Sequence, residues 1–209
     1  MNQLLDLFLP TPCIGCHKPG SPFCTKCQSE FLLARLRVSK AGRSGFAFTS
    51  YNSLAADIVN AIKESGQTSL IGPVASLMAK SWPKELVDVV LVPVPSSPAN
   101  YKRRGYQHTL KLANALEKRI PGVTTRALLS SARERGDQVN LSPVERKSNL
   151  ENAFSVDLRG FRDAGALLVL VDDVITTGAT INAASSALEA AGLSVTGFCV
   201  FAETRAKDA

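Results

Sequence analysis

The sequence predicts an α/β protein, with a core built on a parallel β-sheet and a small cysteine-bearing knuckle at its N-terminal end. Two continuous apolar runs, 88–93 and 166–171, are typical of strands buried on both faces of a parallel sheet. Segments with helical spacing separate the expected strands, and this alternation indicates βαβ units. Four of the five cysteines lie before residue 28, ahead of every expected strand. We therefore expect two units, residues 1–40 and 41–209.

The first half of the chain predicts a short helix, then a strand, then two longer helices. The Leu-rich residues 31–36 are expected to form the short helix. Residues 46–51 alternate apolar and polar side chains after Gly45, as a half-buried strand does. Apolar residues at helical spacing predict helices over 54–62 and 70–82.

The second half contains the clearest strand signals. The run 88–93 is closed by prolines, and 110–116 is expected to form the helix that follows it. The run 166–171 is wholly apolar and predicts a fully buried strand. Small residues over 180–191 predict a helix that ends at a glycine, and 195–201 predicts a final strand.

The length of 209 residues accommodates one medium-sized domain and a small appendage. No apolar run approaches the roughly 18 residues that a membrane-spanning helix needs, so membrane insertion is not expected. Residues 1–9 are apolar but few, and they include Asp6 and no basic residue, unlike a signal peptide. We therefore expect a cytoplasmic protein.

Positive charge is concentrated in one segment. The chain carries 24 Lys and Arg residues against 18 Asp and Glu residues, a net charge of +6. Residues 102–147 contain 11 basic and 4 acidic residues, a net of +7, whereas the remainder has a net charge of −1. This concentration favours an anionic partner, either phosphate groups or nucleic acid. A solvated surface loop is the alternative interpretation of the same charges.

Two Cys-x-x-Cys knuckles lie near the start of the chain. Cys13 and Cys16 form the first knuckle, and Cys24 and Cys27 form the second. Each knuckle presents two thiolates from one tight turn, so the pair can wrap one tetrahedral metal ion. Four thiolates in a reducing compartment favour a structural zinc ion, while an iron–sulfur cluster also matches the number of ligands. Disulfide pairing is disfavoured in the cytosol.

The segment 166–192 has the order of a phosphate-binding turn. An apolar strand ends in Asp172 and Asp173, a Thr-Thr-Gly turn follows at 176–178, and a helix begins. A helix start offers free backbone N–H groups and the positive end of the helix dipole, which suit a phosphate. Two carboxylates would repel a phosphate, but they can accept hydrogen bonds from ribose hydroxyls. The order matches neither a Walker A loop nor a Gly-x-Gly-x-x-Gly fingerprint.

This order closely resembles the phosphoribosyl pyrophosphate motif of type I phosphoribosyltransferases. Over about residues 4–201 the chain also resembles the competence protein F (ComF) family, which implies a type I phosphoribosyltransferase-like core behind a zinc knuckle. The matching segments are the four-cysteine knuckle, a Pro-Val-Pro strand end at 93–95, Arg-Gly-Tyr-Gln-His at 104–108, a Gln…Glu-Arg…Asn segment at 138–149 with Phe154, and the loop 172–180. At 107–108 the family has Asn-Gln, so its amide contacts there are not carried over to this chain.

The resemblance implies a role for each matched position. Asp172 and Asp173 would hold the ribose hydroxyls, and they are the candidate catalytic residues. The 5′-phosphate would be cradled by the residues of the loop, which are Thr176, Thr177, Gly178, Ala179 and Thr180. The pyrophosphate would face basic side chains after Pro95, namely Lys102, Arg103 and Arg104, together with Arg146 from a segment that closes over the site. An exposed helix charge is the alternative interpretation of Arg146.

The implied ligand is phosphoribosyl pyrophosphate with Mg²⁺, and the implied reaction is transfer of the phosphoribosyl group to an acceptor. No segment of the sequence identifies that acceptor. The alternative is a non-catalytic competence-type protein that handles single-stranded DNA during uptake, with the zinc knuckle and the basic segment as contacts. Few aromatic residues lie near the basic run, so the signal for base stacking is weak.

Overall fold

The computed structural model describes residues 11–31, 35–131, 153–162 and 165–204. Its helices are α2 (Thr25–Glu30), α3 (Ser53–Lys63), α4 (Ile71–Lys80), α5 (Pro98–Arg104), α6 (His108–Glu117) and α8 (Ala179–Ala190), with a short 3₁₀ turn η1 (Thr68–Leu70). Its strands are β1 (Leu36–Lys40), β2 (Arg43–Ser50), β3 (Val89–Pro93), β4 (Val123–Thr125), β5 (Leu129–Ser131), β6 (Phe154–Val156), β7 (Leu167–Ile175) and β8 (Val195–Glu203). None of these helices is long and apolar enough to cross a membrane.

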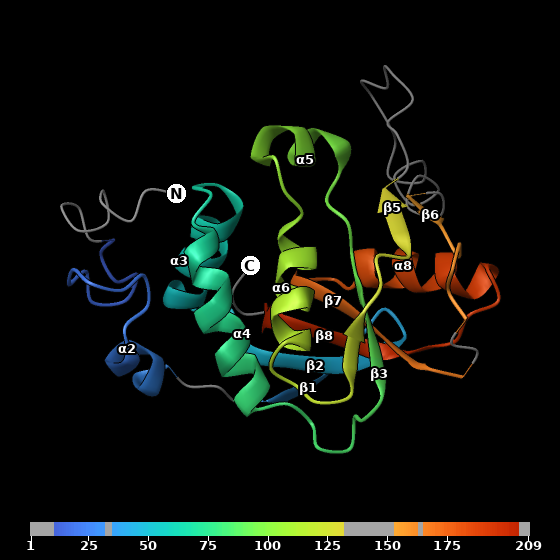
Figure 1. Cartoon of the computed structure of the whole chain (residues 1–209), viewed down its shortest axis with the longest axis horizontal. Coiled ribbons are helices and arrows are strands. Elements are labelled where there is room, and N and C mark those ends of the chain that lie inside the picture. The colour runs from blue at the N-terminus through green and yellow to red at the C-terminus, as the bar shows by residue number, and fades with distance from the viewer. Residues whose placement is uncertain (1–10, 32–34, 132–152, 163–164, 205–209) are drawn as a thin grey trace.

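Six strands form one sheet in the order β1-β2-β8-β7-β3-β4, which Figure 1 shows behind helices α3, α4 and α6. Within this sheet β1 and β2 pair antiparallel, and every other pair is parallel. The strands β5 and β6 form a separate antiparallel pair. Because β3, β7 and β8 run in the same direction, their carboxyl ends meet at one edge of the sheet, where ligands of open α/β sheets bind. The predicted parallel α/β core is confirmed.

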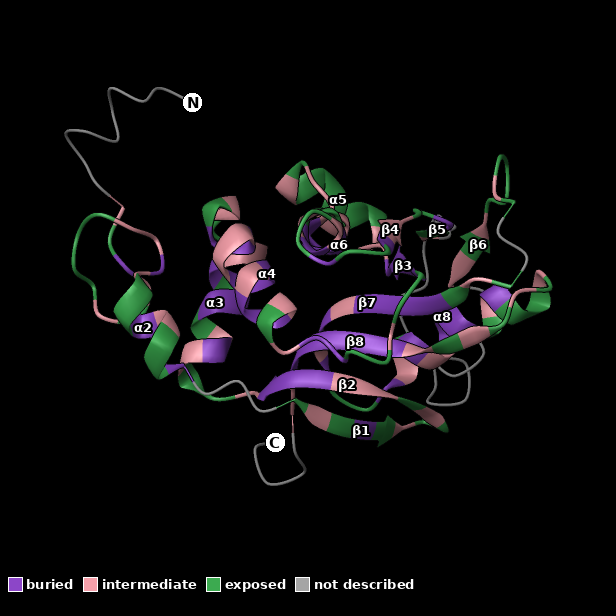
Figure 2. Ribbon diagram, turned by 60° about the horizontal axis from the view of Figure 1, so that its bottom comes forward, coloured by how far each residue is buried: buried purple, intermediate pink, exposed green. Residues whose placement is uncertain are grey.

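Each face of the sheet is covered by its own apolar layer. Side chains alternate along a strand, so Val169 and Val171 of β7 pack with helices α3, α4 and α6, whereas Leu168 and Leu170 pack with α8. Figure 2 shows α3, α4 and α6 above the buried stretches of β7 and β8. The sheet is therefore held between two layers, and its carboxyl edge is left to carry polar side chains.

Local signals fix where the helices near this edge begin and end. The Asn52 side chain caps α3 by accepting from the backbone N–H of Ala55, 2.9 Å away. Helix α5 begins with Pro98 in its first turn, after Ser97, whose hydroxyl accepts from a backbone N–H. It ends at Gly105, whose φ of 75° lies in the left-handed region that favours glycine.

The helix predicted over 31–36 is not found at its ends, Phe31 and Leu36, and residues 32–34 lie outside the described residues. Phe31 has an extended backbone after the end of α2, and Leu36 begins strand β1. Phe31 is instead held by its ring, which stacks on Phe201 at 5.9 Å and meets the edge of Phe23 at 6.0 Å. At Phe31, tertiary packing thus overrides helical propensity. The strand β1, which ends at Lys40, pairs with β2 as the edge of the main sheet.

The strand predicted to end at Val171 continues to Ile175, because β8 also continues and offers a partner as far as Glu203. Asp172 pairs with Val200 in this extension, so the two acids lie inside the strand instead of after it. Helix α5 was not predicted, because it buries no apolar residue and its sequence has no apolar face.

Candidate functional site

The turn from β7 to α8 brings together an exposed set of hydroxyls and a helix start. Thr176, Thr177 and Thr180 are exposed, and Gly178 is buried with a φ of 84° at the N-cap position of α8. A side chain at Gly178 would meet Lys40, because an ideal Cβ would lie 2.9 Å from the Lys40 Cβ. Only glycine therefore combines this conformation with this close approach. The result is a helix N-terminus with a positive dipole end and three hydroxyl groups nearby.

Asp173 is buried and is held by two nitrogen atoms from different helices. Lys63 Nζ, at the end of α3, lies 2.7 Å from Asp173 Oδ2, and His108 Nε2, at the start of α6, lies 2.8 Å from the same oxygen. Neither contact has the direction of a hydrogen bond, so both are close electrostatic contacts. Burial opposes ionisation of Asp173, but His108 and the charge of Lys63 outweigh it and hold the pKa below the usual range of Asp.

The pKa of Asp172 is shifted in the opposite direction from that of Asp173. Burial raises the pKa of its carboxyl well above the usual value, and the adjacent negative charge of Asp173 raises it further. Asp172 Oδ1 accepts from the backbone N–H of Asp173 at 2.9 Å. The two acids and His108 offer ligand atoms that lie within 4.8 Å of one another. The pair therefore presents one compensated carboxylate and one that a cation or hydroxyl donors would stabilise.

The connection from β3 to α5 is linked to this acid pair through Ser96 and His108. The backbone N–H of Ser96 donates to Gln107 Oε1 at 2.8 Å, and Ser96 Oγ lies 3.2 Å from His108 Nδ1. Arg104 Nη1 lies 3.3 Å from the same His108 nitrogen. A polar network therefore runs from the β3–α5 connection to Asp173.

The basic residues expected at the pyrophosphate lie on helix α5 rather than on a loop. Lys102 is exposed, and Arg103 forms an ion pair with Glu64. Arg104 is largely buried and also contacts Glu64, at 3.3 Å. Hydrogen bonding to Arg103 lowers the pKa of Glu64. Arg146 lies outside the described residues.

Three contributors to this site were missed from the sequence. Lys63 and Glu64 lie at the end of α3, where charged residues usually face solvent, and no pattern distinguishes them from such residues. His108 appeared only as a departure from a family motif. That departure was the one available signal, because an imidazole at the first position of a helix beside an acid pair can reach a carboxylate.

The four clustered cysteines come together as predicted. The sulfur atoms of Cys13, Cys16, Cys24 and Cys27 lie within 4.8 Å of one another, close enough to bind one metal ion. Cys16 Sγ and Cys24 Sγ are 3.8 Å apart, and the backbone N–H of Cys24 donates to Cys13 Sγ at 3.3 Å. Burial works against the Cys13 thiolate, but this and other backbone hydrogen bonds lower its pKa to about 6. Burial and hydrogen bonding with the neighbouring thiols raise the pKa of Cys27 to about 12.

The cysteine cluster is continuous with the apolar layer on the α3 face of the sheet. Cys13 and Cys27 are buried there with Phe23 and Phe31. The ring of Phe31 stacks on Phe201 of β8, which also lines a small cavity beside His108 and Asp173. The cluster thus contacts the sheet that carries the acid pair.

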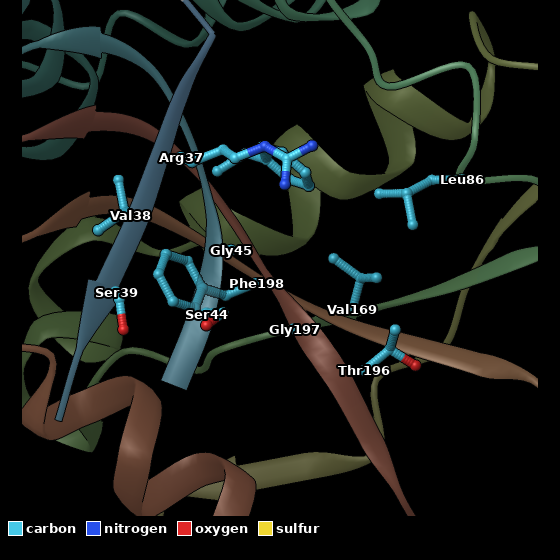
Figure 3. Close-up of a pocket in the computed structure, with 11 residues that line it drawn as sticks. Arg37, Val38, Ser39, Ser44, Gly45, Leu86, Val169, Thr196, Gly197 and Phe198 are labelled. Carbon is cyan, nitrogen blue, oxygen red and sulfur yellow. The ribbon is translucent and has the colours of Figure 1, made fainter. Parts of the chain in front are cut away.

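Two larger hollows lie outside the acid pair. One, of about 260 Å³, adjoins Ser96 and Gln107 and is walled by prolines, serines and the exposed Tyr101. The other, of about 370 Å³, lies toward the amino ends of β7 and β8, and Figure 3 shows Arg37, Leu86, Val169 and Thr196 around it. The second hollow is therefore at the opposite end of the strands from Asp172 and Asp173.

Comparison with known families agrees with this geometry. Residues 102–209, which include the end of α5, the acid pair and the Thr-Thr-Gly turn, match the model of the phosphoribosyl transferase domain. The chain belongs to this family. The expected resemblance to the ComF group is also confirmed, by relatives that carry that name and by the cysteine cluster.

Three relatives illustrate the range of similarity. Competence protein F of Haemophilus influenzae is 32% identical over 103 residues, which cover 49% of this chain and 45% of that protein. Competence protein ComFC of Streptococcus pneumoniae is 28% identical over 184 residues, 86% of this chain and 75% of that protein. DNA utilization protein YhgH of Salmonella typhi is 33% identical over 91 residues, 44% of this chain and 39% of that protein. The matched region thus spans less than half of the first and third relatives.

The charge on Lys63 should stabilise the folded protein in a pH-dependent way. Because the pKa of Asp173 is lowered on folding, its contribution is present above the usual Asp pKa of about 3.9 and is lost as the pH falls below it. We expect Lys63→Met to lower the free energy of unfolding by about 1–3 kcal/mol at pH 7 and by less at pH 3. Urea denaturation at both pH values measures this difference.

The control is Lys80→Met, which removes an exposed lysine from the same position in the last turn of α4. This change should alter stability by less than about 0.5 kcal/mol at either pH. An equal loss at pH 3 and pH 7 in Lys63→Met would show that Lys63 does not stabilise the protein through the ionised carboxylate of Asp173.

Proposed function

We propose that this protein binds phosphoribosyl pyrophosphate with Mg²⁺ at the carboxyl edge of its sheet and transfers the phosphoribosyl group to an acceptor. One observation carries the proposal. In a chain of the phosphoribosyl transferase domain family, the acid pair lies two residues before a helix start that exposes Thr176 and Thr177. A helix N-terminus suits a phosphate, and carboxylates suit hydroxyl groups, so one ribose phosphate satisfies both.

The loop would hold the 5′-phosphate at the start of α8. Its hydroxyl donors come from Thr176, Thr177 and Thr180, and its backbone donors come from the turn around Gly178 and Ala179. Lys102, Arg103, Arg104 and Arg146 are the proposed partners of the pyrophosphate. Arg103 and Arg104 would have to exchange their contacts with Glu64 for the ligand, or share them with it.

The two acids would have unequal roles. Asp173, compensated by Lys63 and His108, would accept a ribose hydroxyl as a fixed carboxylate. Asp172, whose pKa is raised, would accept the second hydroxyl and take a proton from the attacking acceptor. The bond from the anomeric carbon to pyrophosphate breaks as the bond to the acceptor forms, and the pair of electrons leaves with pyrophosphate. Oxygen donors such as Asp172 suit Mg²⁺, which would supply charge neutralisation to the leaving pyrophosphate.

We also propose that the four cysteines hold one structural zinc ion. A tetrahedral site with Zn–S bonds of about 2.3 Å places its sulfur atoms about 3.8 Å apart. The Cys16–Cys24 separation of 3.8 Å fits that value. Cys199, the fifth cysteine, is buried in β8 and is not part of this cluster.

A second candidate function is the handling of single-stranded DNA. Its support is the printed names of the relatives, two competence proteins and a DNA utilization protein, together with the basic segment 102–147. The exposed Lys102 and the half-exposed Arg103 are described members of that segment, whereas 132–152 lie outside the described residues. A basic face of this kind binds phosphates whichever molecule carries them.

Phosphoribosyl pyrophosphate with Mg²⁺ should bind the wild-type protein and bind Asp172→Asn more weakly. Loss of a hydrogen bond to a charged group costs about 1.5–3 kcal/mol, so the Kd should rise by roughly 10- to 150-fold. Calorimetry measures this, with Asp57→Asn, an exposed acid on α3, as the control that should bind like wild type. Equal affinity in Asp172→Asn would overturn the site. Release of pyrophosphate when acceptors are added tests the transfer step.

One zinc ion per chain should be found by elemental analysis of the freshly purified protein. Removal by a chelator should lower the melting temperature, because the cluster is continuous with the core. Cys24→Ser should lose the metal, while Cys199→Ala should keep it, since Cys199 lies in β8. Protein without metal, or a visible absorbance of an iron–sulfur cluster, would contradict the zinc assignment.

Single-stranded DNA, if it binds, should bind through the basic segment in a salt-dependent way. Each phosphate contact contributes about −0.7 to the slope of log affinity against log salt. Replacing Lys102, Arg103 and Arg104 by Ala should then flatten the slope by roughly two units, and phosphoribosyl pyrophosphate should displace a labelled oligonucleotide. Gel shifts at several salt concentrations measure both effects. Absence of binding even at low salt would remove this second function.

A further inference from the structure

The dipeptide Gln107-His108 at the start of α6 contacts both halves of the proposed site. Gln107 Oε1 accepts the backbone N–H of Ser96 at 2.8 Å. His108 Nδ1 lies 3.2 Å from Ser96 Oγ and 3.3 Å from Arg104 Nη1. On the other side of the ring, His108 Nε2 lies 2.8 Å from Asp173 Oδ2. One pair of side chains therefore spans the gap between the β3–α5 connection and the acid pair.

The neighbours of His108 determine which ring nitrogen carries the proton. A guanidinium group can only donate hydrogen bonds, so Arg104 requires Nδ1 to be an acceptor. In the neutral ring the proton is then on Nε2, on the side of the carboxylate of Asp173. Ser96 Oγ can donate to Nδ1 while it accepts from Arg104, 3.4 Å away. The surroundings thus favour one orientation and one tautomer of the imidazole.

The start of α6 is also fixed to the end of α3. Tyr106 donates its hydroxyl to the backbone carbonyl of Ile62. Glu64 contacts Arg104 at 3.3 Å, and Lys63 approaches the same oxygen of Asp173 that His108 approaches. His108 is itself buried, so a change of its rotamer would disturb all of these neighbours. The charged groups that face His108 are therefore Arg104 from α5, Lys63 from α3 and the acid pair of β7.

We propose that His108 is a positioning residue that, together with Gln107, holds Ser96 and Asp173 in one fixed arrangement for the ligand that reaches Asp172. The identity of that ligand rests on the proposed function. The set of contacts that Gln107 and His108 make with Ser96, Arg104 and Asp173, here called the brace, exists within the free protein. A phosphoribosyl ligand needs hydroxyl acceptors and pyrophosphate donors at a constant separation. A small misplacement of such groups is costly, which is why side chains that position them matter.

The proposal makes a specific statement about which side chains can replace His108. A glutamine offers one N–H donor and one carbonyl acceptor, the same two functions as a neutral imidazole with its proton on Nε2. It could donate toward Asp173 and accept from Arg104. A leucine fills similar space but offers neither function. Glutamine is thus expected to preserve the brace, and leucine to break it.

The binding test compares His108→Gln with His108→Leu in calorimetric titrations with phosphoribosyl pyrophosphate and Mg²⁺. We expect His108→Leu to raise the Kd by at least about tenfold, and His108→Gln to stay within about threefold of wild type. His17→Asn, at the other histidine of the chain, is the control and should bind like wild type. If wild type binds and His108→Leu binds equally well, or if His108→Gln is as weak as His108→Leu, the positioning role is overturned.

A second measurement is made on the wild-type protein without ligand, so it does not depend on whether a variant of His108 folds. Nitrogen NMR of the imidazole rings in the free wild-type protein reports which ring nitrogen carries the proton. A protonated Nε2 with an unprotonated Nδ1 is expected, and the ring signals should change in Arg104→Met. If the wild type did not bind phosphoribosyl pyrophosphate, the proposed function would fail. The spectrum would still test whether His108 makes the proposed contacts with Arg104 and Asp173. A proton on Nδ1 alone would overturn it.

Discussion

The burial of one negative charge, the carboxylate of Asp173, organises the carboxyl edge of the sheet. A buried carboxylate is costly unless positive or donating groups accompany it. Two helices that are distant in sequence supply them, because the end of α3 brings Lys63 and the start of α6 brings His108. Both helix ends therefore meet at this carboxylate, and the β3–α5 connection joins them through its contact with His108.

The apolar pattern of the chain was sufficient to predict the interior of the fold. The runs around 88–93 and 166–171 correspond to the strands β3 and β7. They could be recognised because a strand buried on both faces is a continuous apolar run. Strand ends were harder to predict. Whether β7 stops at Val171 or continues to Ile175 depends on the length of its neighbour β8, and pairing between distant segments leaves no local signal.

The candidate site divides in the same way. The Asp-Asp-x-x-Thr-Thr-Gly order is local, so it could be recognised without a structure, and the four cysteines could be grouped by their spacing alone. The compensation of Asp173 is not local. Lys63 is more than 100 residues away in the chain and resembles any lysine at the end of a helix. Only the packing of α3 on the sheet brings the lysine to the acid, where His108 and the lysine together lower the pKa of that acid against the effect of burial.

The turn between β1 and β2 is a surface hairpin, the kind of place at which an epitope or a fluorescent label is usually inserted. Its residues Ala41 and Gly42 have φ values of 50° and 74°, as expected for a tight two-residue turn. The preceding Lys40 packs against Gly178 and donates its amino group to the Thr204 carbonyl at 2.6 Å. An insertion here would push on the start of α8 from 138 positions away in the chain. Gly160 is exposed, and a Cβ atom added to it would meet no other atom within 4 Å. The turn at Gly160 can therefore be lengthened without disturbing the start of α8.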